Sequence, residues 1–271
     1  MEVLRQRRSP KAPADHNKAP SDFMKTIAVY NLKGGVGKTA TAVNIAYLSA
    51  CSGQPTLLWD FDAQAAASWY FQVENSKRKK ASKLIKDKLA LGELIQGTGY
   101  DRLDIIPSDM SNRNIDVNLT GVSGGKLDSW LSMLSETYGV LVLDCPPTLS
   151  ELALRILKAA DAVLITMIPT HLSFETYRHV TEMMEQKKID LAKLYPVLTM
   201  IDRRKSIHQE FTASCKKTLG KTPIGFVPYC SDVEKMGEFR EPLPVFAPRS
   251  PATLAYQLLW DNIRKKALRR R

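Results

Sequence analysis

The sequence contains few cysteines and no long apolar run. Its four cysteines lie far apart, and no two form a Cys-x-x-Cys pair: Cys51, Cys145, Cys215 and Cys230. This spacing argues against a zinc knuckle or a disulfide framework and fits a reducing compartment. No apolar stretch approaches the roughly 18 residues that a membrane-spanning helix needs. The N-terminal segment is basic but has no apolar core, so we expect neither a membrane span nor a secretory signal.

Acidic residues are also in short supply. The chain has 271 residues, with 39 Lys and Arg against 28 Asp and Glu, which gives a formal net charge of +11. Such an excess favours a polyanionic partner, although a basic protein does not require one. Residues 1–23 are rich in Pro, Arg and Lys and have few apolar side chains. We therefore expect a disordered basic arm at 1–23, either solvated or in contact with DNA, and a single domain at 24–271.

From residue 25 onward, short apolar runs alternate with helical patterns. Continuous apolar runs are typical of strands buried on both faces of a parallel sheet. The expected strands are 26–30, 56–60, 103–107, 140–144, 162–168, 196–201 and 224–227, and the expected helices include 126–138, 151–159, 174–187, 207–219 and 252–268. This alternation predicts an α/β fold with a doubly wound, mostly parallel sheet and helices on both faces. A ligand of such a fold lies at the C-terminal ends of the strands.

The most informative segment is Lys33-Gly34-Gly35-Val36-Gly37-Lys38-Thr39, between an expected strand and an expected helix. A glycine loop that leads into a helix N-terminus binds phosphate through backbone N–H groups and the helix dipole. Lys38 is placed to reach the β- and γ-phosphates of a nucleotide, and the Thr39 hydroxyl to ligate Mg²⁺. The alternative is a glycine turn with no ligand, which leaves the two lysines and the threonine unexplained.

Three motifs together resemble the ParA/MinD ATPases. The loop resembles their deviant Walker A motif, KGGxGK[ST]. Residues 57–64 resemble their second acidic motif, and residues 140–147 resemble their Walker B strand with its Asp-x-Pro-Pro switch. The resemblance runs from about Met24 to the end of the chain. Segments 226–229 and 242–246 are more similar to ParA than to MinD, and the fold that the resemblance implies is that of the P-loop NTPases.

The chain departs from the family pattern at several positions near these motifs. Leu32 stands where the usual P-loop has glycine, and Ala40 replaces a second threonine of the loop. Ala63 replaces the proline of Asp-Pro-Gln, and 65–67 are alanines where the family has Gly-Asn and a small polar residue. Lys33, Lys38, Thr39, Asp62 and Asp144 are all retained.

The resemblance assigns roles to these residues with ATP, ADP and Mg²⁺ as cofactors. The loop binds the nucleotide phosphates through Lys33, Gly34, Gly35, Val36, Gly37, Lys38, Thr39 and Ala40. Thr39 ligates the metal directly, Asp144 ligates it through water, and Asp62 orients the attacking water. Lys33 is the signature lysine that crosses a homodimer interface to the partner's phosphates, so Lys33, Lys38 and Asp62 form the catalytic set. Asp60 holds the loop or the magnesium shell, or only caps the end of its strand. The adenine-binding segments that the resemblance implies are 201–204 and 228–230.

The resemblance also implies the partners. A ParA-like protein forms an ATP-dependent homodimer, binds DNA without sequence preference, and works with a ParB-like or other adaptor to position plasmid, chromosome or other cargo. Candidate DNA contacts are Arg240, Arg249, Arg269, Arg270 and Arg271, because phosphate contacts supply most non-specific affinity. We expect a cytoplasmic, nucleoid-associated protein.

Two other functions remain open at this point. MinD-like members end in an amphipathic membrane helix, and the expected last helix has an apolar side with Leu254, Leu258, Leu259, Ile263 and Leu268 beside a basic end. In ParA-like chains the same helix packs on the domain, so we expect DNA rather than a membrane. The third possibility is a nucleotide-dependent scaffold with little hydrolysis.

Overall fold

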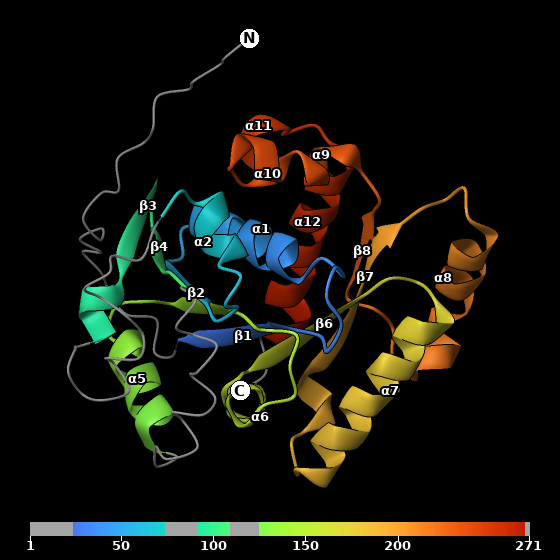
Figure 1. The fold of residues 1–271 in the computed structure, drawn as a ribbon, viewed down its shortest axis with the longest axis horizontal. Coiled ribbons are helices and arrows are strands. Elements are labelled where there is room, and N and C mark those ends of the chain that lie inside the picture. The colour runs from blue at the N-terminus through green and yellow to red at the C-terminus, as the bar shows by residue number, and fades with distance from the viewer. Residues whose placement is uncertain (1–23, 74–90, 109–124, 269–271) are drawn as a thin grey trace.

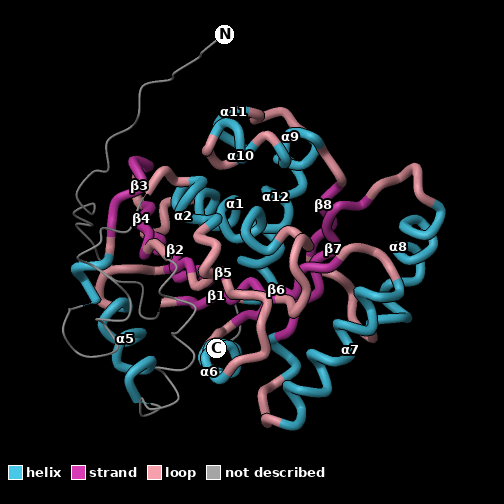
Figure 2. The backbone as a smooth tube through the Cα atoms, in the orientation of Figure 1, coloured by secondary structure: helices cyan, strands magenta, loops and turns pink. Residues whose placement is uncertain are grey.

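An eight-stranded sheet forms the centre of the protein, between two layers of helices (Figures 1 and 2). The computed structural model describes residues 24–73, 91–108 and 125–268. The strand order is β3-β4-β2-β5-β1-β6-β7-β8, and only β3 is antiparallel to its neighbour. The strands are β1 (Lys25–Tyr30), β2 (Thr56–Asp60), β3 (Gln96–Tyr100), β4 (Leu103–Ile106), β5 (Val140–Asp144), β6 (Ala162–Met167), β7 (Leu194–Ile201) and β8 (Gly225–Pro228).

The helices cover both faces of this sheet. They are α1 (Lys38–Cys51), α2 (Ala66–Tyr70), α5 (Gly125–Ser135), α6 (Glu151–Ala159), α7 (His171–Gln186), α8 (Ser206–Leu219), α9 (Ser231–Glu234), α10 (Met236–Phe239), α11 (Leu243–Phe246) and α12 (Pro251–Asn262), which continues as a π-helical turn over Ile263–Ala267. Short 3₁₀ turns occur at Leu91–Leu94 and Leu191–Lys193. Helices α5 to α8 pack on one face, and α1, α12 and the short C-terminal helices lie on the other (Figure 1).

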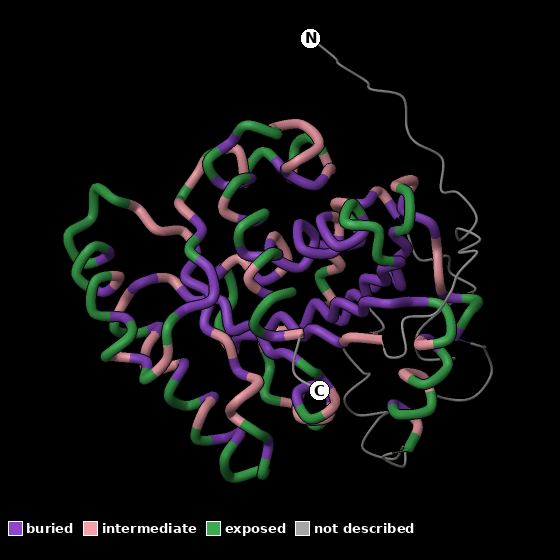
Figure 3. The backbone as a smooth tube through the Cα atoms, turned by 180° about the vertical axis from the view of Figure 1, so that it is seen from behind, coloured by how far each residue is buried: buried purple, intermediate pink, exposed green. Residues whose placement is uncertain are grey.

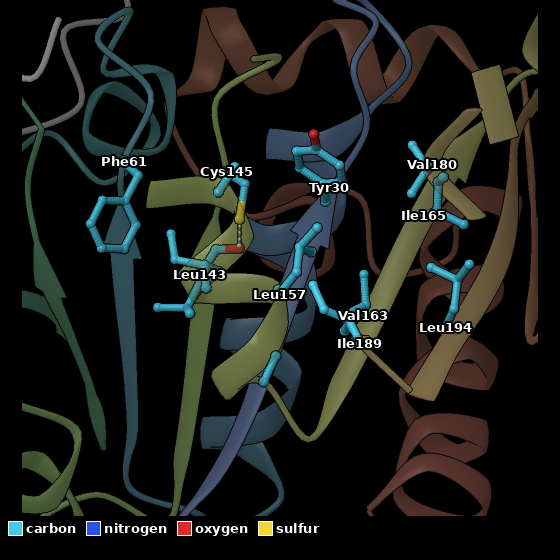
Figure 4. Close-up of a cluster of buried hydrophobic side chains, with 14 of the residues drawn as sticks. Tyr30, Phe61, Leu143, Cys145, Leu157, Val163, Ile165, Val180, Ile189 and Leu194 are labelled. Carbon is cyan, nitrogen blue, oxygen red and sulfur yellow. Dashed lines mark hydrogen bonds between the residues drawn. The ribbon is translucent and has the colours of Figure 1, made fainter. Parts of the chain in front are cut away.

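Both faces of the sheet are hydrophobic, which explains the continuous apolar runs. Successive side chains of a strand point to opposite faces. Ile27 and Val29 of β1 therefore join the cluster under α1 and α12, while Ala28 and Tyr30 join the cluster under α6 and α7. Figure 4 shows part of this second cluster, and Figure 3 shows buried strands behind helices that expose their outer sides.

The doubly wound, mostly parallel sheet predicted from the sequence is confirmed. Strand β3 was not expected, because Gln96-Gly-Thr-Gly-Tyr has two glycines and no apolar run. It lies at the sheet edge, where one partner strand suffices. The short helices α2 and α9 to α11 were also not expected, since four or five residues carry no helical periodicity.

The single apolar side expected for the last helix is wrong. Leu259 and Ile263 are buried against the sheet, whereas Leu254 and Leu258 are 52% and 65% exposed on another side of the helix. The expected arm at 1–23, a basic run at 76–83 and the arginines at 269–271 lie outside the described residues. Among the helices that are described, none has the length and apolar character needed to cross a membrane.

Candidate functional site

The glycine loop between β1 and α1 is braced by two polar side chains from the sheet. Asn31 accepts a hydrogen bond from the Lys33 backbone N–H at 2.8 Å and donates one to the Thr166 carbonyl of β6. Thr199 of β7 donates to the Val36 carbonyl at 3.0 Å. The loop is therefore attached to three neighbouring strands at their C-terminal ends, where the sequence placed the ligand.

Two glycines give the loop its shape. Gly35 and Gly37 have φ values of 70° and 79°, in the left-handed region that residues with a Cβ rarely adopt. Gly37 directly precedes α1, whose first-turn N–H groups have no acceptor within the helix. These donors and the positive end of the helix dipole face whatever occupies the loop, so the geometry suits an anion.

Lys38 is held inside the loop. Its side chain is buried, and Nζ donates to the Lys33 carbonyl at 2.8 Å, which uses one of the three donors of the ammonium group. Burial lowers the pKa of Lys38, while the negative charges of Asp144 and Asp62 act in the opposite direction. Lys33, by contrast, is exposed at the mouth of the loop.

Asp60 and Asp144 form a pair of buried carboxyl groups beside the loop. They occupy matched positions on the neighbouring strands β2 and β5, and both are fully buried. One oxygen of Asp60 accepts hydrogen bonds from the Ser68 N–H (2.9 Å) and hydroxyl (2.7 Å), and the other accepts one from the Asp62 N–H (3.1 Å). Burial nevertheless raises the pKa of Asp60 to about 7.

Asp144 differs because neither of its carboxylate oxygens has a hydrogen-bond partner among the described residues. The Thr39 hydroxyl lies close enough to lower the pKa of Asp144, but the contact lacks the geometry of a hydrogen bond. Burial, followed by the negative charge of Asp60, raises the pKa of Asp144 well above its usual range. A buried carboxylate that lies beside a hydroxyl and accepts no hydrogen bond from the described residues suits a hydrated hard cation such as Mg²⁺.

Asp62 completes the cluster. It follows β2 in a tight turn, in which its side chain accepts from the Gln64 N–H at 2.9 Å and its carbonyl from the Ala65 N–H at 2.8 Å. The charge of Asp62 acts on both Lys38 and Asp144, so Asp62 lies on the side of β2 that faces the loop. The structure thus brings Lys38, Thr39, Asp62 and Asp144 together, as the three motifs predicted.

The segments expected to bind adenine also converge. A cavity of about 1090 Å³ lies beside β8, between α8 and α12. Both segments line it, through Ile201–Arg204 and Pro228–Cys230. No phosphate-loop residue lines this cavity, so adenine binding at these segments stays a prediction.

Two of the candidate DNA contacts lie within the described residues, and their surroundings differ. Arg249 is exposed after α11, whereas Arg240 places its guanidinium 3.8 Å from the centre of the Trp69 ring. Arg269, Arg270 and Arg271 lie beyond the described part of the chain.

Three buried, hydrogen-bonded polar residues were not predicted from the sequence. Asn31, Asn44 and Ser68 are buried polar residues whose side chains bond to distant backbone or side-chain groups. Asn31 and Asn44 carried a usable signal, because each is a polar residue within an otherwise apolar run. Ser68 carried no such signal. It lies in a segment without recognisable periodicity, eight residues after its partner Asp60.

Comparisons with known proteins agree with this geometry. The AAA_31 family model, described as an AAA domain, matches residues 24–193. The sporulation initiation inhibitor protein Soj of Bacillus subtilis is 27% identical over 240 residues, which cover 86% of this chain and 95% of that protein.

Two solved structures share the fold. McdA from Cyanothece, as a variant in complex with ATP, has a TM-score of 0.78 at 18% identity and covers 92% of this chain and 98% of its own. The septum site-determining protein MinD of Pyrococcus horikoshii, complexed with Mg-ADP, has a TM-score of 0.74 at 17% identity, with 89% and 96% covered.

Proposed function

We propose that this chain, which belongs to the AAA_31 family and within it to the ParA/MinD type of partition ATPase, is a weak, adaptor-stimulated ATP hydrolase. It dimerises with ATP, binds DNA without sequence preference, and positions plasmid, chromosome or other cargo with a ParB-like adaptor. The Soj protein and the nucleotide-bound McdA and MinD structures support this proposal at the level of the family and the fold.

The position of Asp144 beside the phosphate loop is the main structural support for this proposal. Burial of an ionised carboxylate without donors is unfavourable, so such a group either takes up a proton or faces a cation. Asp144 lies next to Thr39 at the start of α1, within the electrostatic reach of Lys38. The site therefore fits a Mg²⁺–nucleotide complex with the phosphates in the glycine loop, Thr39 as a direct ligand and Asp144 acting through water.

The side chains divide the work of phosphoryl transfer. Bound Mg²⁺ offsets the negative charge that develops on the transferred phosphoryl group. Lys38 and the N–H groups of the loop hold the β- and γ-phosphates in place. Asp62 holds the attacking water in line with the γ-phosphate, and Asp60 holds Asp62 and α2 through its three accepted hydrogen bonds. Such positioning, rather than covalent chemistry, provides most of the catalysis of phosphoryl transfer.

Lys33 serves the dimer in this proposal. Its exposed side chain lies at the loop mouth, while its carbonyl accepts from Lys38 of the same chain. A second cation from a partner protomer offsets the burial of nucleotide charge in a closed dimer. ATP then holds two protomers together, and hydrolysis releases them.

The proposal is tested by measuring phosphate release from Mg-ATP by the purified full-length chain, together with its mass in solution under ATP and under ADP. We expect slow turnover and a dimer only with ATP. A monomer under both nucleotides with no phosphate release contradicts the proposal.

A membrane-associated function of the MinD kind is the second candidate, because Leu254 and Leu258 are exposed on α12 ahead of a basic segment. Co-sedimentation with anionic liposomes in ATP separates the two functions. Binding to liposomes but not to DNA favours the membrane function.

A further inference from the structure

The short helix α2 is joined to the C-terminal segment by a reciprocal contact between Trp69 and Arg240. The Arg240 guanidinium lies 3.8 Å from the centre of the Trp69 ring, and its Nε donates to the Trp69 carbonyl at 3.1 Å. In return, the Gln72 side-chain amide donates to the Arg240 carbonyl at 3.4 Å. A cation over the face of an indole ring is the strongest form of the cation–π interaction. Two hydrogen bonds and one stacking contact thus join segments about 170 positions apart.

The segment that carries Arg240 is anchored to α1 by hydrogen bonds. It lies between α10 and α11, and Asn44 of α1 bonds to both: its amide donates to the Met236 sulfur at 3.4 Å, and its oxygen accepts from the Leu243 N–H at 2.9 Å. Met236, Leu243 and Asn44 are all buried. Because α1 begins at the phosphate loop, Arg240 is anchored to the same helix that carries Lys38 and Thr39.

The backbone on both sides of this contact is strained. Six non-glycine residues of the described chain have left-handed φ values, and three of them lie here: Ala65 (52°), Gln72 (56°) and Arg240 (54°). Non-glycine residues keep this conformation where surrounding contacts impose it, and such residues cluster at functional sites. Ala65 stands at the start of α2 and Gln72 just beyond its end, so both ends of the helix are held in this way.

Helix α2 connects this contact to the carboxylates of the site. Ser68, the neighbour of Trp69, donates two hydrogen bonds to Asp60, and the Ala65 N–H donates to the Asp62 carbonyl. Tyr70 follows Trp69 in α2. Burial raises the pKa of Tyr70, and the nearby negative charge of Asp144 raises it further. One side of α2 therefore faces the site, while Trp69 on the other side has Arg240 over one face of its ring and is otherwise 53% exposed.

We propose that Trp69 and Arg240 form a latch that fixes α2 against α10 and thereby positions the Asp62 turn for hydrolysis. The latch rests on the proposed ATPase function. Both residues are positioning residues, since neither touches the phosphate loop. Displacement of Asp62 by about 1 Å suffices to slow an in-line reaction by up to roughly 100-fold.

The test compares steady-state hydrolysis of Mg-ATP by wild-type protein with Arg240→Ala, Trp69→Ala and the double variant. We expect turnover to fall by about tenfold or more in each single variant, with KM for ATP within about twofold, because the phosphate loop is untouched. The double variant falls no further than Arg240→Ala, because Arg240→Ala already removes both the stacking contact and the hydrogen bond to the Trp69 carbonyl, whereas Trp69→Ala removes the stacking contact alone. Trp69→Phe keeps a ring under the guanidinium and recovers most of the activity.

Arg178→Ala is the matched control, because Arg178 is an exposed arginine whose ion pairs stay within α7. It keeps wild-type turnover. Turnover within twofold of wild type in both Arg240→Ala and Trp69→Ala, or losses that multiply in the double variant, overturns the latch.

Acrylamide quenching of tryptophan fluorescence tests the contact independently of hydrolysis. The difference in quenching between wild type and Trp69→Phe gives the contribution of Trp69. We expect this contribution to rise in Arg240→Ala, because the guanidinium no longer shields one face of the indole ring. Unchanged quenching overturns the latch. If the wild-type protein hydrolyses no ATP, both the proposed function and the positioning role are overturned. If the wild type hydrolyses ATP and the variants match its turnover, only the latch is overturned.

Discussion

Asp60 and Asp144 lie opposite one another on β2 and β5, both fully buried, yet within the described part of the chain hydrogen-bond donors reach Asp60 and not Asp144. Ser68 and the backbone of Asp62 supply those donors to Asp60. The two acids therefore divide their tasks: Asp60 organises the chain around it, and Asp144 is left facing Thr39 and Lys38. We propose that this asymmetry separates a structural carboxyl group, Asp60, from one that faces a metal ion, Asp144.

Asp144→Asn tests this division. The amide removes the free-energy cost of protonating or burying a carboxylate that accepts no hydrogen bond from the described residues. We therefore expect the metal-free protein to become more stable, with Tm rising by about 2–4 °C for each kcal/mol gained. The extra stabilisation that Mg²⁺ gives to the nucleotide-bound protein disappears, and hydrolysis is lost. Thermal unfolding with ATP, with and without Mg²⁺, measures both effects. A variant that still gains stability from Mg²⁺ is inconsistent with Asp144 as part of the metal shell.

The pH dependence of stability follows from Asp60. Its pKa is about 7 in the folded protein and near 3.8 in the unfolded chain. Between these values the folded state binds more protons, so stability falls as the pH rises from about 4 to about 7. Asp144, with a raised pKa, contributes in the same direction. Asp60→Asn in metal-free buffer should flatten the decline of Tm between pH 5 and 7.5, and an unchanged slope contradicts the burial cost assigned to Asp60.

The two loop lysines should separate nucleotide binding from dimerisation. Lys38→Ala removes a buried cation from the loop and should weaken ATP binding by about 2–3 kcal/mol, the cost of a lost charged hydrogen bond. Lys33→Ala leaves that cation in place, so ATP affinity persists while the ATP dimer and hydrolysis are lost. Fluorescent-nucleotide titration and light scattering measure the two properties. A Lys33→Ala protein that dimerises and hydrolyses ATP normally rules out the role across the interface.

Asp62→Ala should bind Mg-ATP with near wild-type affinity but hydrolyse it at least about 100-fold more slowly, because the attacking water loses its positioning group. The ATP-bound dimer should then accumulate. Single-turnover hydrolysis with prebound ATP measures this. Wild-type turnover would remove Asp62 from the mechanism, and loss of ATP binding would make its role structural.

Much of the site was predictable because its residues follow strand ends in recognisable patterns. The loop lysines, Thr39, Asp62 and Asp144 each come directly after or near an apolar strand, and parallel strands bring such positions to one edge. Contacts between distant, unpatterned segments were not predictable. Trp69 and Arg240 lie on or beside helices of four or five residues, which have no sequence periodicity. The partners of Asn44 depend on how α10 and α11 pack against α1, which the sequence pattern does not specify.

The structure also changes how the candidate DNA contacts should be tested. Arg240 stacks on Trp69, so reversing its charge disturbs α2 as well as any DNA contact. Arg249 is exposed, and Arg269, Arg270 and Arg271 follow the described chain, so these four positions are the better choices. Reversal there should weaken binding to all duplex sequences alike and leave ATP affinity unchanged.

The most direct test of the account is binding to unrelated DNA duplexes over a series of salt concentrations, with Mg-ATP and with Mg-ADP, followed by fluorescence anisotropy. We predict tight binding with ATP only, no preference among sequences, and a log–log salt slope of roughly −0.9 for each phosphate contacted. Glutamate at Arg249 or at Arg269–Arg271 should flatten that slope. Equal, weak binding with either nucleotide would contradict a nucleotide-switched DNA-binding ATPase.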